Sequence, residues 1–317
     1  MQKMTQSLFR AAGLLCLVTS TAFAAQVLAP DANEGDLVPT GKGWGERAYP
    51  APPRVDPSGN ASGKAGQGQG ANNGIFYHGG PVMLGTPTAY YIWYGNWSGN
   101  TATTILTDLA QNIGGSNYFN INTTYYDGSN THVTGSVAFG GSTTDSYSHG
   151  TALSDAAIQA VVASAISSGL PKDTNAVYFV LTSADVTATS GFCTQYCGWH
   201  THGTISGSDI KYSFVGNPDR CPSACSAQAT GPNGNAGADG MASIIAHELE
   251  EATTDPDLNA WYDRRGYENA DKCAWTFGTT STASNGSKYN MTLGSRNYLI
   301  QRNWVNASGG YCAVSYQ

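Results

Sequence analysis

The chain has 317 residues, of which only 12% are charged and 40% are hydrophobic, and its formal net charge at pH 7 is −7. This length allows one or two domains and is enough to bury a substantial core. The acidic balance argues against binding to the phosphates of nucleic acids, which needs a basic face. The 18 tyrosines and 7 tryptophans exclude a disordered chain. The composition therefore predicts a lightly charged, Gly-rich globular protein.

The first 24 residues have the pattern of a secretory signal peptide. Lys3 and Arg10 supply a positive region, residues 11–18 form a short apolar run, and residues 22–24 (Ala-Phe-Ala) form a small-x-small cleavage site. The apolar run is too short to span a bilayer, so the pattern favours export over an uncleaved anchor. We predict a secreted protein, extracellular or periplasmic, without stable membrane insertion.

Cleavage at this site leaves six cysteines, all beyond residue 190. An even number of cysteines in an exported protein is typical of disulfides, and the sequence leaves their pairing open. The segment 193–202 (CTQYCGWHTH) combines thiols and imidazoles, which could also hold a structural zinc ion. Because export favours disulfides over zinc thiolates, we expect disulfides at Cys193, Cys197, Cys221, Cys225, Cys273 and Cys312.

Residues 25–75 are rich in Gly, Pro, Asn and Gln and contain few large hydrophobic side chains. The stretch 63–70 (GKAGQGQG) cannot bury much surface, so we predict a disordered mature N-terminus. A pro-segment that masks an active site is the alternative. The chain thus divides into a signal peptide (1–24), this segment (25–75) and one folded domain (76–317).

Strand and helix patterns alternate within the folded domain. In chain order they predict a strand over 86–94, a helix over 105–113, a strand over 133–139, a helix between Ser154 and Gly169, strands over 176–181 and 210–215, and a helix over 241–254. This order predicts a mixed α/β (α+β) domain in two or three layers, with a mixed sheet. A loop-rich C-terminal part, stapled by the disulfides, follows the last helix.

The last predicted helix carries the most informative residues. His247 and Glu251 are four residues apart and therefore lie on one side of the helix. Glu248 lies between apolar neighbours, where a carboxylate needs a cation or a hydrogen-bond network. Glu250 lies roughly opposite the apolar face and is expected to be solvated. The pattern His-Glu-x-x-Glu is similar to the His-Glu-x-x-His zinc helix, with a carboxylate as the second ligand.

A zinc site with one open position needs a third protein ligand. Acidic residues are frequent downstream, and Glu268 is our first choice because it can return from a second helix or loop. Asp257 ranks second, because it lies ten residues after His247, and Asp271 is a further candidate ligand. The alternative is a helix whose His247 and Glu251 only form hydrogen bonds with a loop.

The sequence from Tyr77 onward resembles the phosphate-induced protein 1 family, also called EXORDIUM-like proteins. The matching stretches follow the family's order: YHGGPV (77–82), YYIWYGNW (90–97), VYFVLTSADV (177–186), CTQYCGWH (193–200), YSFVGNP (212–218), CPSAC (221–225), ADGMASIIAHELEEATTDPDLNAWY (238–262) and ENADKC (268–273). The resemblance implies an extracellular protein linked, in plants, to growth and cell-wall signalling.

The resemblance also bears on individual residues. His247, Glu248 and Glu251 fit the family's helix, and Glu268 with Asp271 fits its acidic segment. The family has Asn-Pro where this chain has Asp255-Pro256, which favours Glu268 over Asp257 as the third ligand. The short signal peptide and the absence of plant-type flanking elements suggest a microbial member.

Two functional hypotheses follow. The first is a secreted, zincin-like zinc hydrolase acting on a peptide or protein. His247, Glu251 and Glu268 would hold zinc, Glu248 would be the general base, and His200 or Tyr262 would stabilise the oxyanion. The second is a non-catalytic extracellular protein that binds cell-wall polysaccharide or acts in growth signalling. Its metal would be structural, for example calcium held through Asp271, or absent.

Overall fold

The computed structural model describes residues 39–42, 54–55, 61–62 and 74–317. The predicted signal peptide and most of the predicted segment 25–75 lie outside the described residues. In the described part of the chain, no helix combines the length and the apolar character that crossing a membrane requires.

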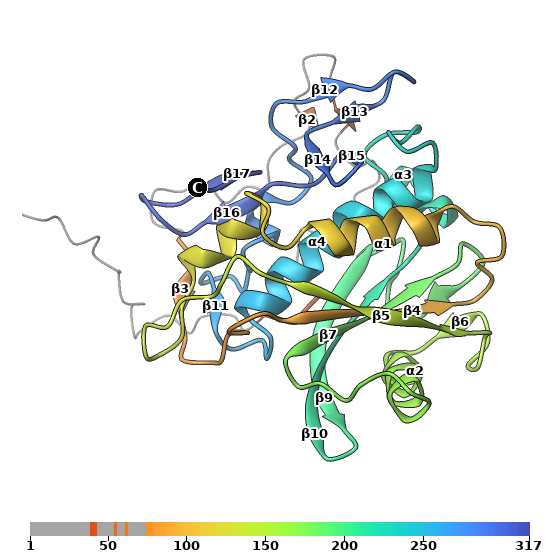
Figure 1. The fold of residues 1–317 in the computed structure, drawn as a ribbon, viewed down its shortest axis with the longest axis horizontal. Coiled ribbons are helices and arrows are strands. Elements are labelled where there is room, and N and C mark those ends of the chain that lie inside the picture. The colour runs from red at the N-terminus through yellow and green to blue at the C-terminus, as the bar shows by residue number, and fades with distance from the viewer. Residues whose placement is uncertain (1–38, 43–53, 56–60, 63–73) are drawn as a thin grey trace, which may run out of the picture.

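A five-stranded sheet forms the centre of the domain, in the order β5-β4-β7-β10-β9 (Figure 1). β4 (Thr88–Tyr94), β5 (Ala138–Asp145), β7 (Ala176–Thr182) and β10 (Ser208–Val215) are mutually parallel. β9 (Gly198–Ile205) is the antiparallel edge strand and pairs with β10. β7 is buried along its whole length, as expected for a central strand covered on both faces.

Helices cover both faces of this sheet, which makes three layers. α1 (Ala102–Asn112) and α4 (Ala236–Thr254) lie together on one face, and α2 (Asp155–Ser167) lies on the other (Figure 1). Ser154 caps α2 by accepting a hydrogen bond from the backbone N–H of Ala157, as predicted. The mixed α/β class, the mixed sheet and the three predicted helices are therefore confirmed.

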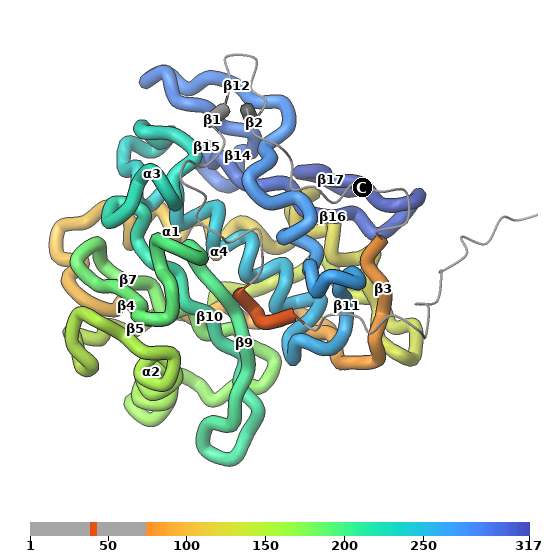
Figure 2. The backbone as a smooth tube through the Cα atoms, turned by 180° about the vertical axis from the view of Figure 1, so that it is seen from behind, coloured from red at the N-terminus to blue at the C-terminus, as the bar shows by residue number. Residues whose placement is uncertain are grey.

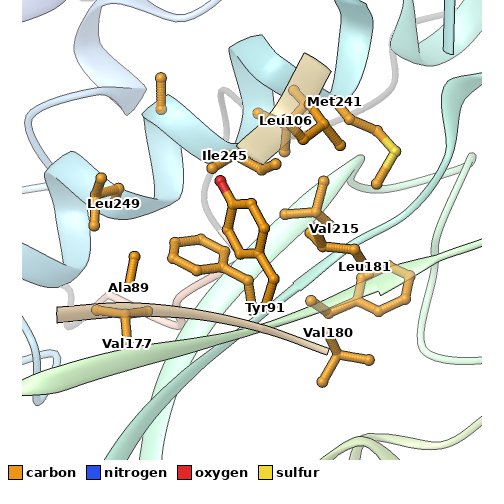
Figure 3. Packing of buried hydrophobic residues seen from close by; sticks show 14 of the residues in the cluster. Ala89, Tyr91, Leu106, Val177, Val180, Leu181, Val215, Met241, Ile245 and Leu249 are labelled. Carbon is orange, nitrogen blue, oxygen red and sulfur yellow. The ribbon is translucent and has the colours of Figure 1, made fainter. Parts of the chain in front are cut away.

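α4 is buried on nearly every side. Met241, Ile245 and Leu249 are four residues apart and pack on the sheet, close to Tyr91 of β4 (Figure 3). The opposite side of the helix is covered by the 3-10 helix η2 (Phe119–Thr124), which also contacts β16 (Asn303–Val305). A helix enclosed in this way must find buried partners for its polar side chains.

Short elements complete the domain. They are β1 (Arg54–Val55), β2 (Ala61–Ser62), β3 (Phe76–Tyr77), β6 (Ala152–Leu153), β8 (Thr187–Ala188), η3 (Pro218–Arg220), α3 (Pro222–Cys225), β11 (Trp261–Tyr262), η4 (Asp271–Cys273), β12 (Ser281–Thr282), β13 (Lys288–Tyr289), β14 (Met291–Leu293), β15 (Arg296–Tyr298) and β17 (Tyr311–Ala313). The C-terminal part is rich in loops and short hairpins, as predicted.

The six cysteines form three disulfides, Cys193–Cys221, Cys197–Cys225 and Cys273–Cys312. The disulfide hypothesis is confirmed, and the alternative of a zinc site on Cys193 and Cys197 is wrong. The predicted strand over 133–139 is also wrong in its position, because β5 begins only at Ala138. β5 is an edge strand with alternating exposure, so its sequence lacks the apolar run of a buried strand.

Candidate metal centre

Two histidines and three carboxylates meet between β9, α4 and the loop that follows β11. His247 Nε2 lies 3.0 Å from Glu251 Oε1 and 3.6 Å from Asp271 Oδ1. His200 Nε2, from β9, lies 3.0 Å from Glu268 Oε1 and 3.8 Å from Glu251 Oε2. Glu251 thus joins the two halves of one group, which we call the histidine–carboxylate cluster (His200, His247, Glu251, Glu268 and Asp271). All five residues are buried.

The loop that supplies Glu268 and Asp271 is fixed from several directions. The backbone N–H of Asp271 donates to Glu251 Oε1 at 3.0 Å, and the N–H of Glu268 donates to Asp271 Oδ2 at 3.3 Å. Lys272 Nζ lies 3.1 Å from Asp263 Oδ2 and 4.8 Å from the centre of the Trp304 ring. The disulfide of Cys273 ties the end of the loop to β17. These contacts hold two acidic residues against α4.

Glu248 belongs to the same region. It is fully buried, and a Cβ atom at Gly198 of β9 would lie 2.9 Å from Glu248 Oε1. The carboxylate therefore packs directly against the backbone of β9. A residue larger than glycine at position 198 would leave no room for it. Its charge helps to raise the pKa of both His247 and Glu268.

The electrostatics of the cluster favour a bound cation. Burial raises the pKa of Glu268 well above its usual range, and the neighbouring carboxylates, Glu251 first, raise it further. Burial and Asp271 raise the pKa of Glu251 in the same way. Crowded buried carboxylates cannot all carry their charge unless a counter-charge is present. A divalent cation would supply that charge and replace the protons.

The pKa values of the two imidazoles shift in opposite directions. Burial lowers the pKa of His200 to about 4, so its ring is neutral at physiological pH. Burial also opposes charge on His247, but the carboxylates of Glu251 and Asp271 outweigh it and raise the pKa of His247 well above the ordinary value. His200 is thus ready to act as a metal ligand, because only the neutral ring has a free lone pair. His247 would lose a proton on metal binding.

The donor types and spacings fit a metal such as zinc. Zinc binds imidazole nitrogen and carboxylate oxygen at roughly 2.0–2.2 Å, which places tetrahedral ligand atoms roughly 3.3–3.6 Å apart. The four separations run from 3.0 to 3.8 Å, two of them around His200 and two around His247, and Glu251 takes part in both groups. In addition, Glu251 Oε2 is buried without a hydrogen-bond donor. The cluster therefore has the composition and the size of a small-cation site.

Other predicted site residues lie elsewhere. Asp257 lies in a second, more exposed group, 3.7 Å from His202 Nδ1 and 3.3 Å from Lys211 Nζ. Lys211 supplies the positive charge of that group, so Asp257 needs no metal there. Tyr262 stacks on the ring of His78, with 3.6 Å between ring centres.

Glu250 is the clear error of the helical-wheel reasoning. It was expected in solvent, yet it is fully buried, because η2 and β16 cover the side of α4 that faces away from the sheet. Asn303 Nδ2 donates to Glu250 Oε2 at 2.5 Å. Burial raises the pKa of Glu250 well above its usual range, and the amides of Asn303 and Asn122 lower it in part. Nothing in the local sequence signals this cover, because η2 is more than a hundred residues away.

The strand β9 was not predicted, although His200 was kept as a candidate. Its sequence GWHTHGTI has few large apolar residues, so it lacks the pattern of a buried strand. Its first three residues, including His200, are buried, and the three that follow are partly exposed, so its burial does not alternate. The signal that could have found it is the pair of histidines, His200 and His202, shortly after Cys197.

Together these features define a disulfide-linked, three-layer α/β protein with a buried histidine–carboxylate centre. The chain belongs to the phosphate-induced protein 1 family: the model of the phosphate-induced protein 1 conserved region matches residues 75–313.

Several plant proteins are similar to it. Protein EXORDIUM-like 3 of Arabidopsis thaliana is 32% identical over 305 residues, which cover 83% of this chain and 90% of that protein. Protein EXORDIUM-like 5 of the same plant is 33% identical over 271 residues, covering 72% and 74%. Protein PHOSPHATE-INDUCED 1 of Nicotiana tabacum is 28% identical over 222 residues, covering 60% and 68%. The suggested microbial source stays a prediction.

No solved structure matches this chain. The zincin-like part of the predicted fold class therefore has no support from a fold neighbour.

Proposed function

We propose that the protein is an extracellular, non-catalytic member of its family, and that its histidine–carboxylate cluster holds one structural zinc ion. The observation that carries this proposal is the burial of two imidazoles and three carboxylates, in which the Nε2 atom of each imidazole lies 3.0–3.8 Å from two carboxylate oxygens. Such a group is costly to bury without a counter-charge. One divalent cation would satisfy it and would join β9, α4 and the loop after β11.

The donor set favours zinc over the calcium alternative. Calcium takes six to eight oxygen ligands, whereas His200 and His247 offer nitrogen. Imidazole and carboxylate together are typical zinc ligands. The cluster also offers more donors than the predicted set of His247, Glu251 and Glu268. Glu268 lies 3.0 Å from His200, and Asp271 lies 3.6 Å from His247, so two groups of three donors share Glu251.

Burial also favours a structural role over the predicted peptidase. A catalytic zinc ion keeps one position open to water and substrate. Here the side chains of His200, His247, Glu251 and Glu268 are at most 2% exposed, and Glu248 is fully buried. A small cavity does exist at the other end of α4, but its lining includes none of these residues: Ser226, Asp239, Ser243, Trp275, Phe277 and Leu299 are among those that form it.

This proposal gives His200 and Tyr262 no role as oxyanion stabilisers. His200 takes part in the cluster itself, and Tyr262 is engaged with His78. The extracellular location is supported by the three disulfides and by the signal-peptide pattern. A partner in the cell wall, such as a polysaccharide, is an expectation taken from the family resemblance.

The test is metal content and stability of the mature protein, purified without added metal or nickel. We expect about one zinc per chain in the wild type and its loss in His247→Ala and Glu251→Ala, with a large fall in melting temperature. His132→Ala is the matched control, because His132 is exposed and its ring contacts the carbonyl of Thr123 and the ring of Tyr126, away from the cluster. A wild-type protein that holds no zinc, even after dialysis against zinc, would contradict the proposal.

A second arm separates structural from catalytic zinc. We expect no hydrolysis of casein or of a mixed peptide library by the zinc-loaded wild type. Zinc-dependent hydrolysis that disappears in Glu248→Gln, while the zinc remains bound, would instead support the peptidase hypothesis.

A further inference from the structure

Residues 39–42 (Pro-Thr-Gly-Lys), which we call the strap, lie across the edge of the sheet. In Figure 2 they form the short red segment beside β9, between β9 and the end of α4 near β11. The backbone N–H of His200 donates to the carbonyl oxygen of Gly41 at 3.1 Å. β9 pairs with β10 on its other side, so this bond extends the sheet by one partner. The strap therefore binds the strand that carries a residue of the cluster.

Gly41 fits this position closely. Its φ is +65°, in the region that favours glycine, and a Cβ atom there would lie 1.9 Å from the carbonyl oxygen of His200. Leu258 Cδ2, beyond the end of α4, would lie 3.4 Å from the same atom. The strap thus sits between β9 and the segment after α4, and any side chain at position 41 would push it away.

Lys42 reaches a site that is built for its ammonium group. Its Nζ lies 2.5 Å from Asp155 Oδ2, 5.1 Å from the centre of the Trp199 ring and 5.5 Å from that of Tyr196. A carboxylate beside two aromatic faces is a combination that binds cations. The second oxygen of Asp155 accepts a hydrogen bond from Ser190 Oγ at 2.6 Å, and Ser190 Oγ lies 2.5 Å from the Tyr196 hydroxyl. Asp155 and Tyr196 are thereby held in place through one serine.

We propose that Asp155, Tyr196 and Trp199 form a recognition site for the lysine of a Gly-Lys segment, and that the chain fills this site with its own Gly41-Lys42 to seal the edge of β9 at His200. Each contact is weak, because Asp155 is about half exposed and exposed ion pairs contribute little. The strap belongs to the same chain, so its local concentration is high and weak contacts suffice. Because the contacts are individually weak, the loss of one of them is expected to release the strap from β9.

Hydrogen exchange of the His200 amide tests the strap directly, because that N–H has Gly41 as its acceptor. In the full mature chain we expect Lys42→Ala and Asp155→Asn each to speed this exchange by about tenfold, a loss of about 1.4 kcal/mol in the closing equilibrium. Lys172→Ala is the control, because Lys172 is an exposed lysine whose Nζ donates to the carbonyl of Ser206, away from the strap. Unchanged exchange of the His200 amide in both Lys42→Ala and Asp155→Asn would overturn the proposal.

Recognition of the lysine itself is tested in trans. The synthetic peptide Pro-Thr-Gly-Lys-Gly, at millimolar concentration, is expected to slow the His200 amide again in Lys42→Ala but not in Lys42→Ala/Asp155→Asn. The same peptide with alanine in place of lysine is the matched control. Equal protection by both peptides would show that the aromatic–carboxylate site does not recognise lysine.

The sealing role rests on the proposed zinc site and has its own readout. We expect zinc to pass from Lys42→Ala to a chelator several-fold faster than from the wild type or from Lys172→Ala. Equal rates of zinc loss, together with a changed exchange of the His200 amide, would overturn the sealing role. The binding of the strap to β9 would still stand. A protein without zinc would refute the proposed function, whereas the amide experiment would still decide whether the strap binds.

Discussion

Asp255 shows how a single buried carboxyl group responds to its surroundings. It lies at the C-terminal end of α4, where its Oδ1 accepts the backbone N–H groups of Asn259 and Ala260, at 2.6 and 2.5 Å. Its Oδ2 is buried without a hydrogen-bond partner. Burial raises the pKa of Asp255 to about 7, with Glu251 and Asp257 adding to the shift and the two backbone bonds opposing it.

This shift predicts a pH dependence with a definite sign. Between the unfolded pKa of about 3.9 and the folded value near 7, the folded state binds more protons than the unfolded state, so stability falls as the pH rises. In metal-free protein we expect Asp255→Asn to gain a few kcal/mol relative to the wild type between pH 4 and pH 8. Urea unfolding across this range measures it.

The control for this experiment is Asp127→Asn. Asp127 also accepts backbone N–H groups, from Ser129 and Thr131, but in an exposed turn. This variant measures what the same substitution does outside the interior. If the stability of Asp255→Asn relative to the wild type changes with pH no more than that of Asp127→Asn, the role given to Asp255 is contradicted.

At the level of single residues, the sequence predicts a contact correctly where both residues belong to one helix. The spacing of His247 and Glu251 places them on one side of α4, and the structure brings them within 3.0 Å. It failed for Glu250, since the cover over that side comes from η2 and β16, which are far away in the sequence. A helical wheel describes the faces of a helix but not what packs on each of them.

The packing of β9 against α4 sets the distance between the two sides of the histidine–carboxylate cluster. Gly198 begins β9, and a Cβ atom there would lie 2.5 Å from Ile244 Cγ2, 2.9 Å from Glu248 Oε1 and 3.0 Å from the carbonyl oxygen of Phe214. Two of these three contacts are to α4, the helix that carries His247 and Glu251. A side chain at position 198 must therefore move the helix or the strand.

We expect Gly198→Ala to destabilise the protein by about 1–3 kcal/mol, as overpacking of a well-filled interior does. We also expect it to weaken zinc binding, since it separates His200 on β9 from Glu251 on α4. Gly203→Ala is the control on the same strand, because a Cβ there comes too close only to the flexible amide end of Gln159, at 2.8 Å, and meets a ring atom of Tyr212 in ordinary van der Waals contact at 3.6 Å. Thermal melting and zinc titration measure both effects, and equal behaviour of the two variants would refute the prediction.

At the scale of elements, the sequence predicts what has a strong local period. α1, α2, β4, β7 and β10 were found close to their observed bounds, because each has a continuous apolar face or core. β9 and the true extent of β5 were missed. Both are edge strands with small or polar residues, and their position depends on pairing with β10 and β4. Such strands are set by tertiary context more than by their own residues.

Across the whole molecule, the cluster is closed by the C-terminal part of the chain. The disulfide Cys273–Cys312 links the loop of Glu268 and Asp271 to the hairpin of β16 and β17. Within the same region, the backbone N–H of Trp304 donates to the carbonyl of Asn269 at 3.1 Å. This hairpin thus holds the loop of Glu268 and Asp271 against α4, on the side of the helix that faces away from the sheet.

We expect the double variant Cys273→Ser/Cys312→Ser to lose about 3–4 kcal/mol of stability and to bind zinc more weakly. Its loop would no longer be tied to the hairpin. Cys193→Ser/Cys221→Ser is the matched control, since that disulfide closes a loop of similar length, 28 against 39 residues, away from the acidic loop. Zinc titration should separate the two variants, and equal zinc affinity would contradict the role given to the hairpin.

The sequence predicts three disulfides but not which cysteines pair. It also ranks Glu268 as a ligand without showing that Glu268 lies against His200, whereas Asp271 lies against His247. Both gaps have the same cause: the pairing of distant segments follows from the topology of the sheet and the C-terminal hairpins. Residue type and local spacing carry no information about that pairing.

Zinc-edge X-ray absorption on the mature protein, purified without added metal, would show whether the histidine–carboxylate cluster holds zinc. We expect about one zinc per chain, bound by imidazole nitrogen and carboxylate oxygen at roughly 2.0–2.2 Å. The absence of zinc, or a shell of sulfur at roughly 2.3 Å, would contradict the histidine–carboxylate centre.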